Sequence, residues 1–189
     1  MGKITLITGS ENSGKSRWAV SCFDCCNNIQ YLCTSPKLDK STMDRIVYNE
    51  SSHNVCWDLR CNFRFDAPPD DLSDYDNFII DSISDLAARI FYYDLQILGF
   101  SEIYRIDERT EQFIIQAMEF VKKIKTSGGN AVVITNEAGF LQNMKDEETA
   151  VYKNVLCTLN QRLAAFADEV YFSVSGIQFK ISKEANGYV

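Results

Sequence analysis

The feature that most constrains this chain is the stretch of residues 9–16, which reads GSENSGKS. It matches the pattern G-x-x-x-x-G-K-[ST], a loop whose backbone N–H groups surround phosphate oxygens. Such a phosphate loop follows a buried strand and opens a helix, so it predicts an α/β fold with a mostly parallel sheet. Its members are Gly9, Ser10, Glu11, Asn12, Ser13, Gly14, Lys15 and Ser16.

Each residue type in the phosphate loop has a separate physical role. Gly9 and Gly14 lack a Cβ, so the backbone can adopt positive φ and approach phosphate oxygens closely. Lys15 is expected to reach the β- and γ-phosphates, and the Ser16 hydroxyl is expected to ligate Mg²⁺. A helix that starts near Gly14 adds its positive dipole end. The loop therefore predicts binding of a nucleoside triphosphate with magnesium, and it leaves open whether ATP or GTP is preferred.

The residues that flank the loop support this interpretation. Residues 3–8 are short, apolar and β-branched, as a buried parallel strand should be. Residues 16–23 contain neither glycine nor proline and can continue as a helix.

Composition narrows the class of protein. With 189 residues, of which 46% are hydrophobic, the chain is predicted to form a single domain over 1–189. The net charge of −7 and the lack of a dense Lys/Arg run disfavour nucleic acid as a partner. We expect no signal peptide and no membrane span. Seven cysteines, an odd number, are typical of reduced thiols, which predicts a cytoplasmic location.

Alternating apolar strands and amphipathic helices extend this pattern along the chain. Further strands are expected at 29–34, 77–81 and 131–135, and an antiparallel hairpin at 169–174 and 177–182 is expected at one edge of the sheet. Helices are expected at 42–49, 107–125 and 146–167, with an irregular polar stretch at 50–65. Residues 86–99 form an apolar, aromatic segment of the kind that builds a core or a subunit interface.

Asp81 stands at the carboxyl end of the expected strand 77–81. In enzymes with a phosphate loop, an acidic residue at this place binds or orients Mg²⁺. The alternative is a helix N-cap, and the two roles could be divided between Asp81 and Ser82.

Polar residues also follow two other expected strands, namely Thr34, Ser35, Asn136 and Glu137. Polar side chains at the carboxyl ends of parallel strands line the ligand crevice of such sheets, so these four are expected to line the nucleotide and substrate site. The alternative for Thr34 and Asn136 is that they cap the turns in which they lie.

Several stretches together resemble the adenosylcobinamide kinase/adenosylcobinamide-phosphate guanylyltransferase family of cobalamin biosynthesis. They appear in the family's order and span nearly the whole chain: 7–9, 13–17, 31–35, 45–46, Trp57, 133–137, Gly139, 160–165, 167–170, 174–177 and Lys180. The phosphate loop alone is generic, whereas the Thr-Asn-Glu, Asn-Gln-Arg-Leu-Ala and Val-Ser-Gly-Ile segments are specific.

The resemblance implies a RecA-like sheet, a homotrimer and two reactions. The first is phosphorylation of the aminopropanol hydroxyl of a cobinamide-type corrinoid, and the second is transfer of GMP onto that phosphate. The GMP passes through a covalent intermediate on a histidine just after Arg45-Ile46. In this chain Tyr48 takes the place of that histidine, and a phenol with a pKa near 10 substitutes poorly for an imidazole.

His53 is the sole histidine of the chain. It is either a replacement nucleophile on a shifted loop or a solvated loop residue without chemistry. The kinase reaction is thus better supported than guanylyl transfer. Two alternatives stay open: a nucleotide-binding protein without transferase activity, and a kinase for another small alcohol.

Overall fold

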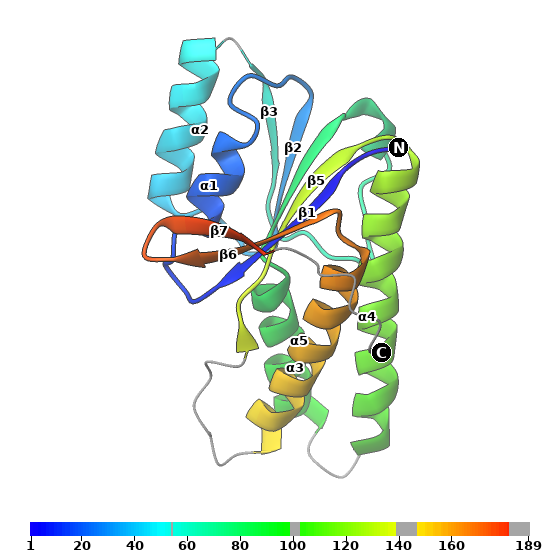
Figure 1. Ribbon diagram of the computed structural model, residues 1–189. Coiled ribbons are helices and arrows are strands. Elements are labelled where there is room, and N and C mark those ends of the chain that lie inside the picture. Colours follow the sequence, from blue (N-terminus) through cyan, green and yellow to red (C-terminus); the bar gives the residue numbers. More distant parts are fainter. Residues whose placement is uncertain (54, 99–102, 139–146, 182–189) are drawn as a thin grey trace.

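The computed structural model describes residues 1–53, 55–98, 103–138 and 147–181. Within these ranges seven strands form one sheet in the order β3-β2-β4-β5-β1-β6-β7 (Figure 1). The strands are β1 (Ile4–Gly9), β2 (Ile29–Cys33), β3 (Trp57–Arg60), β4 (Asn77–Asp81), β5 (Asn130–Ile134), β6 (Glu169–Val174) and β7 (Ile177–Ile181). All neighbours pair in parallel except β6 and β7, which form the antiparallel edge hairpin. The expected fold class is confirmed.

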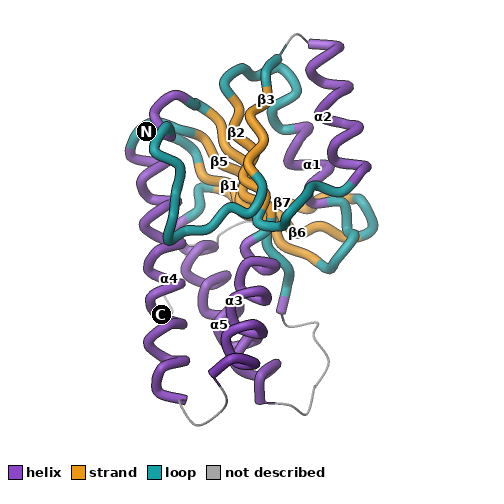
Figure 2. Tube along the Cα trace, turned by 180° about the vertical axis from the view of Figure 1, so that it is seen from behind, coloured by secondary structure: helices purple, strands orange, loops and turns teal. Residues whose placement is uncertain are grey.

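Helices cover both faces of the sheet (Figures 1 and 2). They are α1 (Lys15–Ser21), α2 (Lys40–His53), α3 (Ile83–Leu98), α4 (Ile103–Thr126) and α5 (Glu147–Phe166), with a 3-10 turn η1 (Leu72–Asp74). One core cluster joins Leu6 and Leu32 to α3, α4 and α5, and a second joins Ile7 and Tyr31 to α1 and α2. Side chains alternate between the faces of a strand, so each central strand supplies both clusters.

The central strands are buried along their whole length, which explains why their sequences are nearly continuous apolar runs. Every residue of β1 and β2 is buried, and so are four of the five residues in β4 and in β5. Helices on both faces exclude water, so an alternating polar pattern is not tolerated. Of the aromatic segment at 86–99, Phe91 is 3% exposed and packs in the core.

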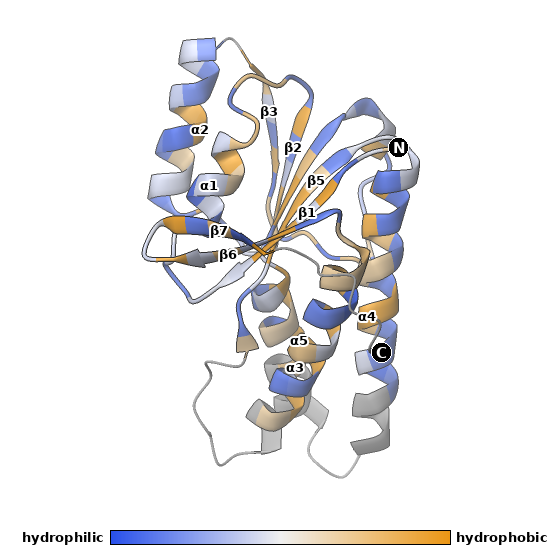
Figure 3. Cartoon of the chain, in the orientation of Figure 1, coloured by the Kyte–Doolittle hydropathy of each residue, from blue (hydrophilic) through white to orange (hydrophobic). Residues whose placement is uncertain are grey.

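Two expectations for residues 42–65 are wrong. The helix is longer than 42–49, because Asp39 caps α2 by accepting a hydrogen bond from the Thr42 N–H at 3.0 Å, and the helix continues to His53. The stretch 50–65 is not irregular throughout, since residues 57–60 form the parallel edge strand β3. Most of α2 is hydrophilic, which weakens its signal in the sequence (Figure 3).

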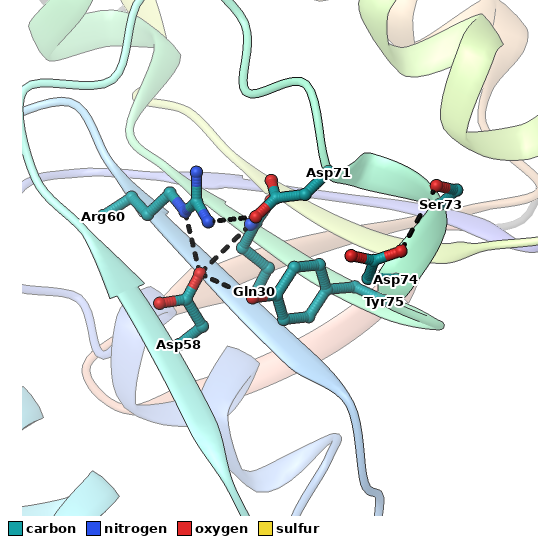
Figure 4. Close-up of polar contacts among 7 residues, drawn as sticks. All are labelled: Gln30, Asp58, Arg60, Asp71, Ser73, Asp74 and Tyr75. Carbon is teal, nitrogen blue, oxygen red and sulfur yellow. Dashed lines mark hydrogen bonds and ion pairs between the residues drawn. The ribbon is translucent and has the colours of Figure 1, made fainter.

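A polar network fastens β3 to the connection that leads into β4 (Figure 4). The Asp58 carboxylate accepts hydrogen bonds from Arg60 Nε at 2.8 Å, Tyr75 Oη at 2.9 Å and Gln30 Nε2 at 3.2 Å. Arg60 also pairs with Asp71. These contacts explain how a strand with two charged residues is held at the edge of the sheet.

Candidate nucleotide-binding site

The phosphate loop connects β1 to α1, as the sequence predicts. Gly9 has φ +151°, and a Cβ at this position would lie 2.3 Å from the carbonyl oxygen of Ser173. Gly14 has φ +93° and is the N-cap of α1. Both glycines therefore adopt a backbone conformation that side chains disfavour, and Gly9 also allows β6 to approach closely.

The hairpin β6–β7 braces the phosphate loop from the other end of the chain. The carbonyl oxygen of Ser13 accepts hydrogen bonds from Ser173 Oγ at 2.7 Å and from the Gly176 N–H at 2.9 Å. A Cβ on Gly14 would lie 3.2 Å from Gly176 Cα, so the two backbones are nearly in contact. Sequence analysis missed this role of the hairpin, although Ser173 and Gly176 lie in or beside a stretch that resembles the family.

The Lys15 side chain is directed back into the loop. It is 6% exposed, and its Nζ donates hydrogen bonds to the carbonyl oxygens of Ser10 at 2.6 Å and Gly9 at 3.2 Å. Burial lowers the pKa of Lys15, while the charges of Asp81, Asp85 and Glu11 act in the opposite direction. The ammonium group therefore lies inside the loop, where it bonds to carbonyl oxygens. The oxygens of a bound phosphate would be stronger acceptors than these carbonyl oxygens.

Asp81 and Ser16 lie together beside Lys15. Burial raises the pKa of Asp81, whereas hydrogen bonds from Tyr31 and Ser16 and the charge of Lys15 oppose this shift. The Tyr31 hydroxyl donates a hydrogen bond to Asp81 Oδ2. The pKa of Tyr31 is raised, mainly by burial and secondly by the Asp81 carboxylate. A hydroxyl and a carboxylate in contact are a donor set that suits Mg²⁺, which takes few protein ligands and completes its shell with water and phosphate oxygens. The described residues contain no cluster of three or more His, Cys, Asp or Glu side chains suited to a metal ion.

The helix-capping alternative for Asp81 is resolved by its neighbour. Ser82 Oγ accepts a hydrogen bond from the Asp85 N–H at 3.2 Å, which makes Ser82 the N-cap of α3. The Asp81 carboxylate is left to face Ser16 and Tyr31. Ser82 therefore takes the capping role, and the metal role of Asp81 stays a prediction.

Thr34 joins the ends of β2 and β4. It is 1% exposed, its N–H donates to the Asp81 carbonyl at 2.8 Å, and its Oγ1 donates to the Ser82 carbonyl at 2.8 Å. The carbonyl oxygen of the next residue, Ser35, accepts a hydrogen bond from the Asn62 N–H at 3.0 Å. Thr34 thus holds the backbone around Asp81 in place.

Asn136 and Glu137 lie next to the phosphate loop at the end of β5. The Glu137 N–H donates to the Gly9 carbonyl at 3.1 Å, and Thr8 Oγ1 donates to Glu137 Oε2 at 3.5 Å. Asn160 of α5 donates to the Asn136 carbonyl at 2.9 Å. Sequence analysis assigned no role to Asn160, although it opens the specific segment 160–165.

A cavity of about 570 Å³ extends from the phosphate loop between α1 and α2. Its lining combines the loop, one side of each helix and the hairpin turn: Asn12, Ser13, Gly14, Lys15, Ser16, Arg17, Trp18, Ser21, Asp39, Ser41, Thr42, Arg45, Gly176 and Gln178. The cavity lining does not include the four residues that the sequence placed at the nucleotide and substrate site, namely Thr34, Ser35, Asn136 and Glu137.

The structure does not bring His53 to the phosphate loop. His53 is the last residue of α2 and is exposed, whereas the cavity is lined by the first half of that helix. Eight residues separate it from Arg45, or about 12 Å along a helix axis. Tyr48, one turn beyond Arg45, is 66% exposed.

Comparisons with known proteins agree with the resemblance noted in the sequence. The model of the family described as cobinamide kinase / cobinamide phosphate guanyltransferase matches residues 5–181. The chain is 27% identical over 185 residues to the bifunctional adenosylcobalamin biosynthesis protein CobU of Salmonella typhimurium, covering 94% of this chain and 99% of that protein. It is 24% identical over 189 residues to the protein of the same name from Escherichia coli K12, with the same coverage.

The family match covers nearly the whole chain, and it includes the phosphate loop, all of β1 except Ile4, and every strand from β2 to β7. The chain therefore belongs to the cobinamide kinase / cobinamide phosphate guanyltransferase family and is a transferase.

Proposed function

We propose that this chain, as one nucleotide-binding domain over 1–189, is a Mg²⁺-dependent kinase that phosphorylates a hydroxyl of a cobinamide-type corrinoid. The observation that carries the proposal is that Asp81 contacts Ser16 and lies near Lys15, two residues that line the cavity. Phosphoryl transfer depends mainly on positioning and on neutralising charge, and these three residues supply both.

Each of these groups has a distinct part in the proposed reaction. The backbone N–H groups of the phosphate loop and the Lys15 ammonium group bind the β- and γ-phosphates, while Ser16 and Asp81 would hold the magnesium ion. When bound there, the ion would supply positive charge to offset the negative charge that develops on the transferred phosphoryl group. The wall around the phosphates consists of Gly9, Ser10, Glu11, Asn12, Ser13 and Gly14. The residues that support this wall are Thr34, Ser35, Asn136 and Glu137.

The decisive experiment is phosphorylation of cobinamide with ATP or GTP in the presence of Mg²⁺, followed by mass spectrometry of the corrinoid. We expect a mass gain of one phosphoryl group with the wild-type chain and none with Asp81→Asn. Because Asn is nearly isosteric and removes a buried carboxylate, this variant should fold. Nucleotide binding without any phosphorylated corrinoid would favour a binding protein that lacks transferase activity.

A kinase for another small alcohol makes a different prediction. In that case cobinamide would not raise the melting temperature of the nucleotide-bound chain, while a different alcohol in a thermal-shift panel would. The thermal-shift panel thus identifies the alcohol that binds, whereas the phosphorylation experiment identifies the reaction.

Guanylyl transfer has weaker support than the kinase reaction. The chain carries Tyr48 where the family histidine is expected, and His53 lies at the far end of α2. We therefore propose that the kinase reaction is retained without a histidine-bound GMP intermediate.

We further propose that the chain forms a homo-oligomer in the cytoplasm, as a trimer by family resemblance. Val174, Ile177, Phe179 and Ile181 of the edge hairpin are each between 42% and 60% exposed, which is typical of a surface that another chain covers. All seven cysteines are free thiols, which suits a reducing compartment, and no helix among the described residues is long and apolar enough to cross a membrane. Light scattering of the wild type and of Phe179→Lys tests the assembly.

A further inference from the structure

Arg45 is a buried donor without a partner on the wall of the nucleotide cavity. It lines the cavity that contains Lys15 and Ser16, and its Nε is buried with no hydrogen-bond partner among the described residues. A buried donor that stays unpaired destabilises the fold, so native structures retain few of them. An acceptor on a bound ligand would satisfy this group.

The charges around Arg45 show what kind of ligand fits. Lys15, Arg17 and Arg45 are the cations of the lining and Asp39 is its anion, although the chain as a whole has a net charge of −7. Asp39 is occupied as the cap of α2, since it accepts hydrogen bonds from the Thr42 N–H at 3.0 Å and Ser41 Oγ at 2.7 Å. The local excess of positive charge therefore favours a polyanion that extends beyond the phosphate loop.

Helix α2 holds Arg45 at this wall, because residues before and after Arg45 on the helix are buried. Thr42, Ile46 and Asn49 are 1–3% exposed. Asn49 Nδ2 also donates to Asp24 Oδ1 at 2.7 Å, which ties α2 to the turn that follows α1. The guanidinium is thus presented from a fixed backbone, which reduces the entropy lost when it binds a ligand.

The direction of a bound triphosphate identifies the group that Arg45 meets. In a phosphate loop the lysine reaches the β- and γ-phosphates, and the remainder of the nucleotide leaves along the first turn of the following helix. Here that turn carries Ser16 and Arg17, and the cavity continues from it to Arg45 on α2. We propose that Arg45 binds the α-phosphate of the nucleoside triphosphate.

The proposal rests on the proposed function, because it assumes that the phosphate loop binds a nucleoside triphosphate. A guanidinium presents two parallel N–H groups that match two phosphate oxygens, which a lysine cannot do. In the kinase reaction the α-phosphate does not react, so Arg45 contributes to binding and not to the chemical step. Loss of the side chain then raises KM for the nucleotide and leaves kcat unchanged.

Calorimetry with Mg²⁺ and two ligands tests the assignment. For Arg45→Ala we expect Kd for ATP or GTP to rise about 10- to 100-fold, the loss of one charge-assisted contact. Kd for inorganic pyrophosphate, which fills only the sites of the β- and γ-phosphates, should stay unchanged. Arg45→Lys should fall between the wild type and Arg45→Ala, since it keeps the charge and loses the paired donors.

Lys40→Ala is the matched control, because Lys40 is exposed on the same helix and does not line the cavity. It should leave both dissociation constants unchanged. Equal losses for nucleotide and pyrophosphate with Arg45→Ala, or no loss for either, would overturn the α-phosphate assignment. If Arg45→Ala has a lower melting temperature than the wild type, the dissociation constants of Arg45→Lys for the same two ligands decide the assignment. If the wild type itself binds no nucleoside triphosphate, the proposed function fails, which is a distinct result.

Discussion

The two walls of the cavity, the phosphate loop and helix α2, are held in different ways. The phosphate loop is fixed by backbone contacts from β1, from Glu137 after β5 and from the hairpin β6–β7, and three of its residues, Gly9, Asn12 and Gly14, have positive φ. The α2 wall packs through a few buried side chains, while Val47 and Tyr48 are more than half exposed. The first wall is constrained by geometry, so few substitutions are compatible with it. The second presents side chains from a regular helix, where chemistry can change without disturbing the fold.

The largest expected effect concerns the constrained wall. Lys15→Ala removes the ammonium group that neutralises the transferred phosphoryl group, and we expect kcat/KM for the kinase reaction to fall by at least about 10²–10³-fold. The melting temperature should change little, because the two hydrogen bonds that the structure shows for Lys15 both go to carbonyl oxygens of the same loop. Normal turnover in this variant would refute the role of the phosphate loop.

A second change tests whether backbone contact fixes this wall. Gly9→Ala places a Cβ 2.3 Å from the Ser173 carbonyl oxygen at φ +151°, and we expect it to destabilise the fold by about 3 kcal/mol. Gly128→Ala is the control, since Gly128 also has positive φ (+94°) but open space around its Cβ position. It should cost about 1 kcal/mol. Equal losses of free energy of unfolding in the two variants would show that contact with β6 is unimportant.

A smaller effect should come from the ion pairs of Glu169 in β6, one with Lys180 within the hairpin and one with Lys3 just before β1. Hydrogen bonds from Lys180 and then Lys3 lower the pKa of Glu169 from 4.5 to about 2. Because the unfolded chain takes up this proton first, the stabilising contribution is complete above pH 4.5 and is lost as the pH falls toward 2. Glu169→Gln should therefore lower the free energy of unfolding by about 0.5 kcal/mol at pH 7, an amount that 1 M salt reduces. A difference between the two proteins that persists at pH 2 would contradict this.

The smallest effect is expected at the end of α2. His53→Ala should leave kcat and KM of the kinase reaction unchanged, since His53 is exposed and outside the cavity lining. After incubation with GTP, intact-mass measurement should find no acid-labile GMP adduct on either protein. An adduct on the wild type that the variant lacks would establish a histidine intermediate. Helix α2 would then supply a catalytic residue, as the phosphate loop does in the proposed kinase reaction.

How far the sequence could predict this structure differs between the same two regions. Strands β1, β4 and β5 and the loop are predictable, because burial on both faces demands continuous apolar runs and the loop demands glycine at set positions. Strand β3 was missed because Asp58 and Arg60 interrupt its apolar pattern, and a polar network outside the strand compensates for them. The contact of Ser173 with Ser13 joins residues 160 positions apart, and no local pattern encodes such a pair.

The brace between Ser13 and Gly176 has a consequence for synthesis of the chain on the ribosome. The phosphate-loop sequence is complete at residue 16, but the loop is held by contacts of Ser13 with Ser173 and Gly176. A nascent chain cannot set the loop in its final form until nearly all of the sequence has emerged. If the loop binds nucleotide as proposed, binding would stabilise the molecules in which the first strand has joined the last hairpin.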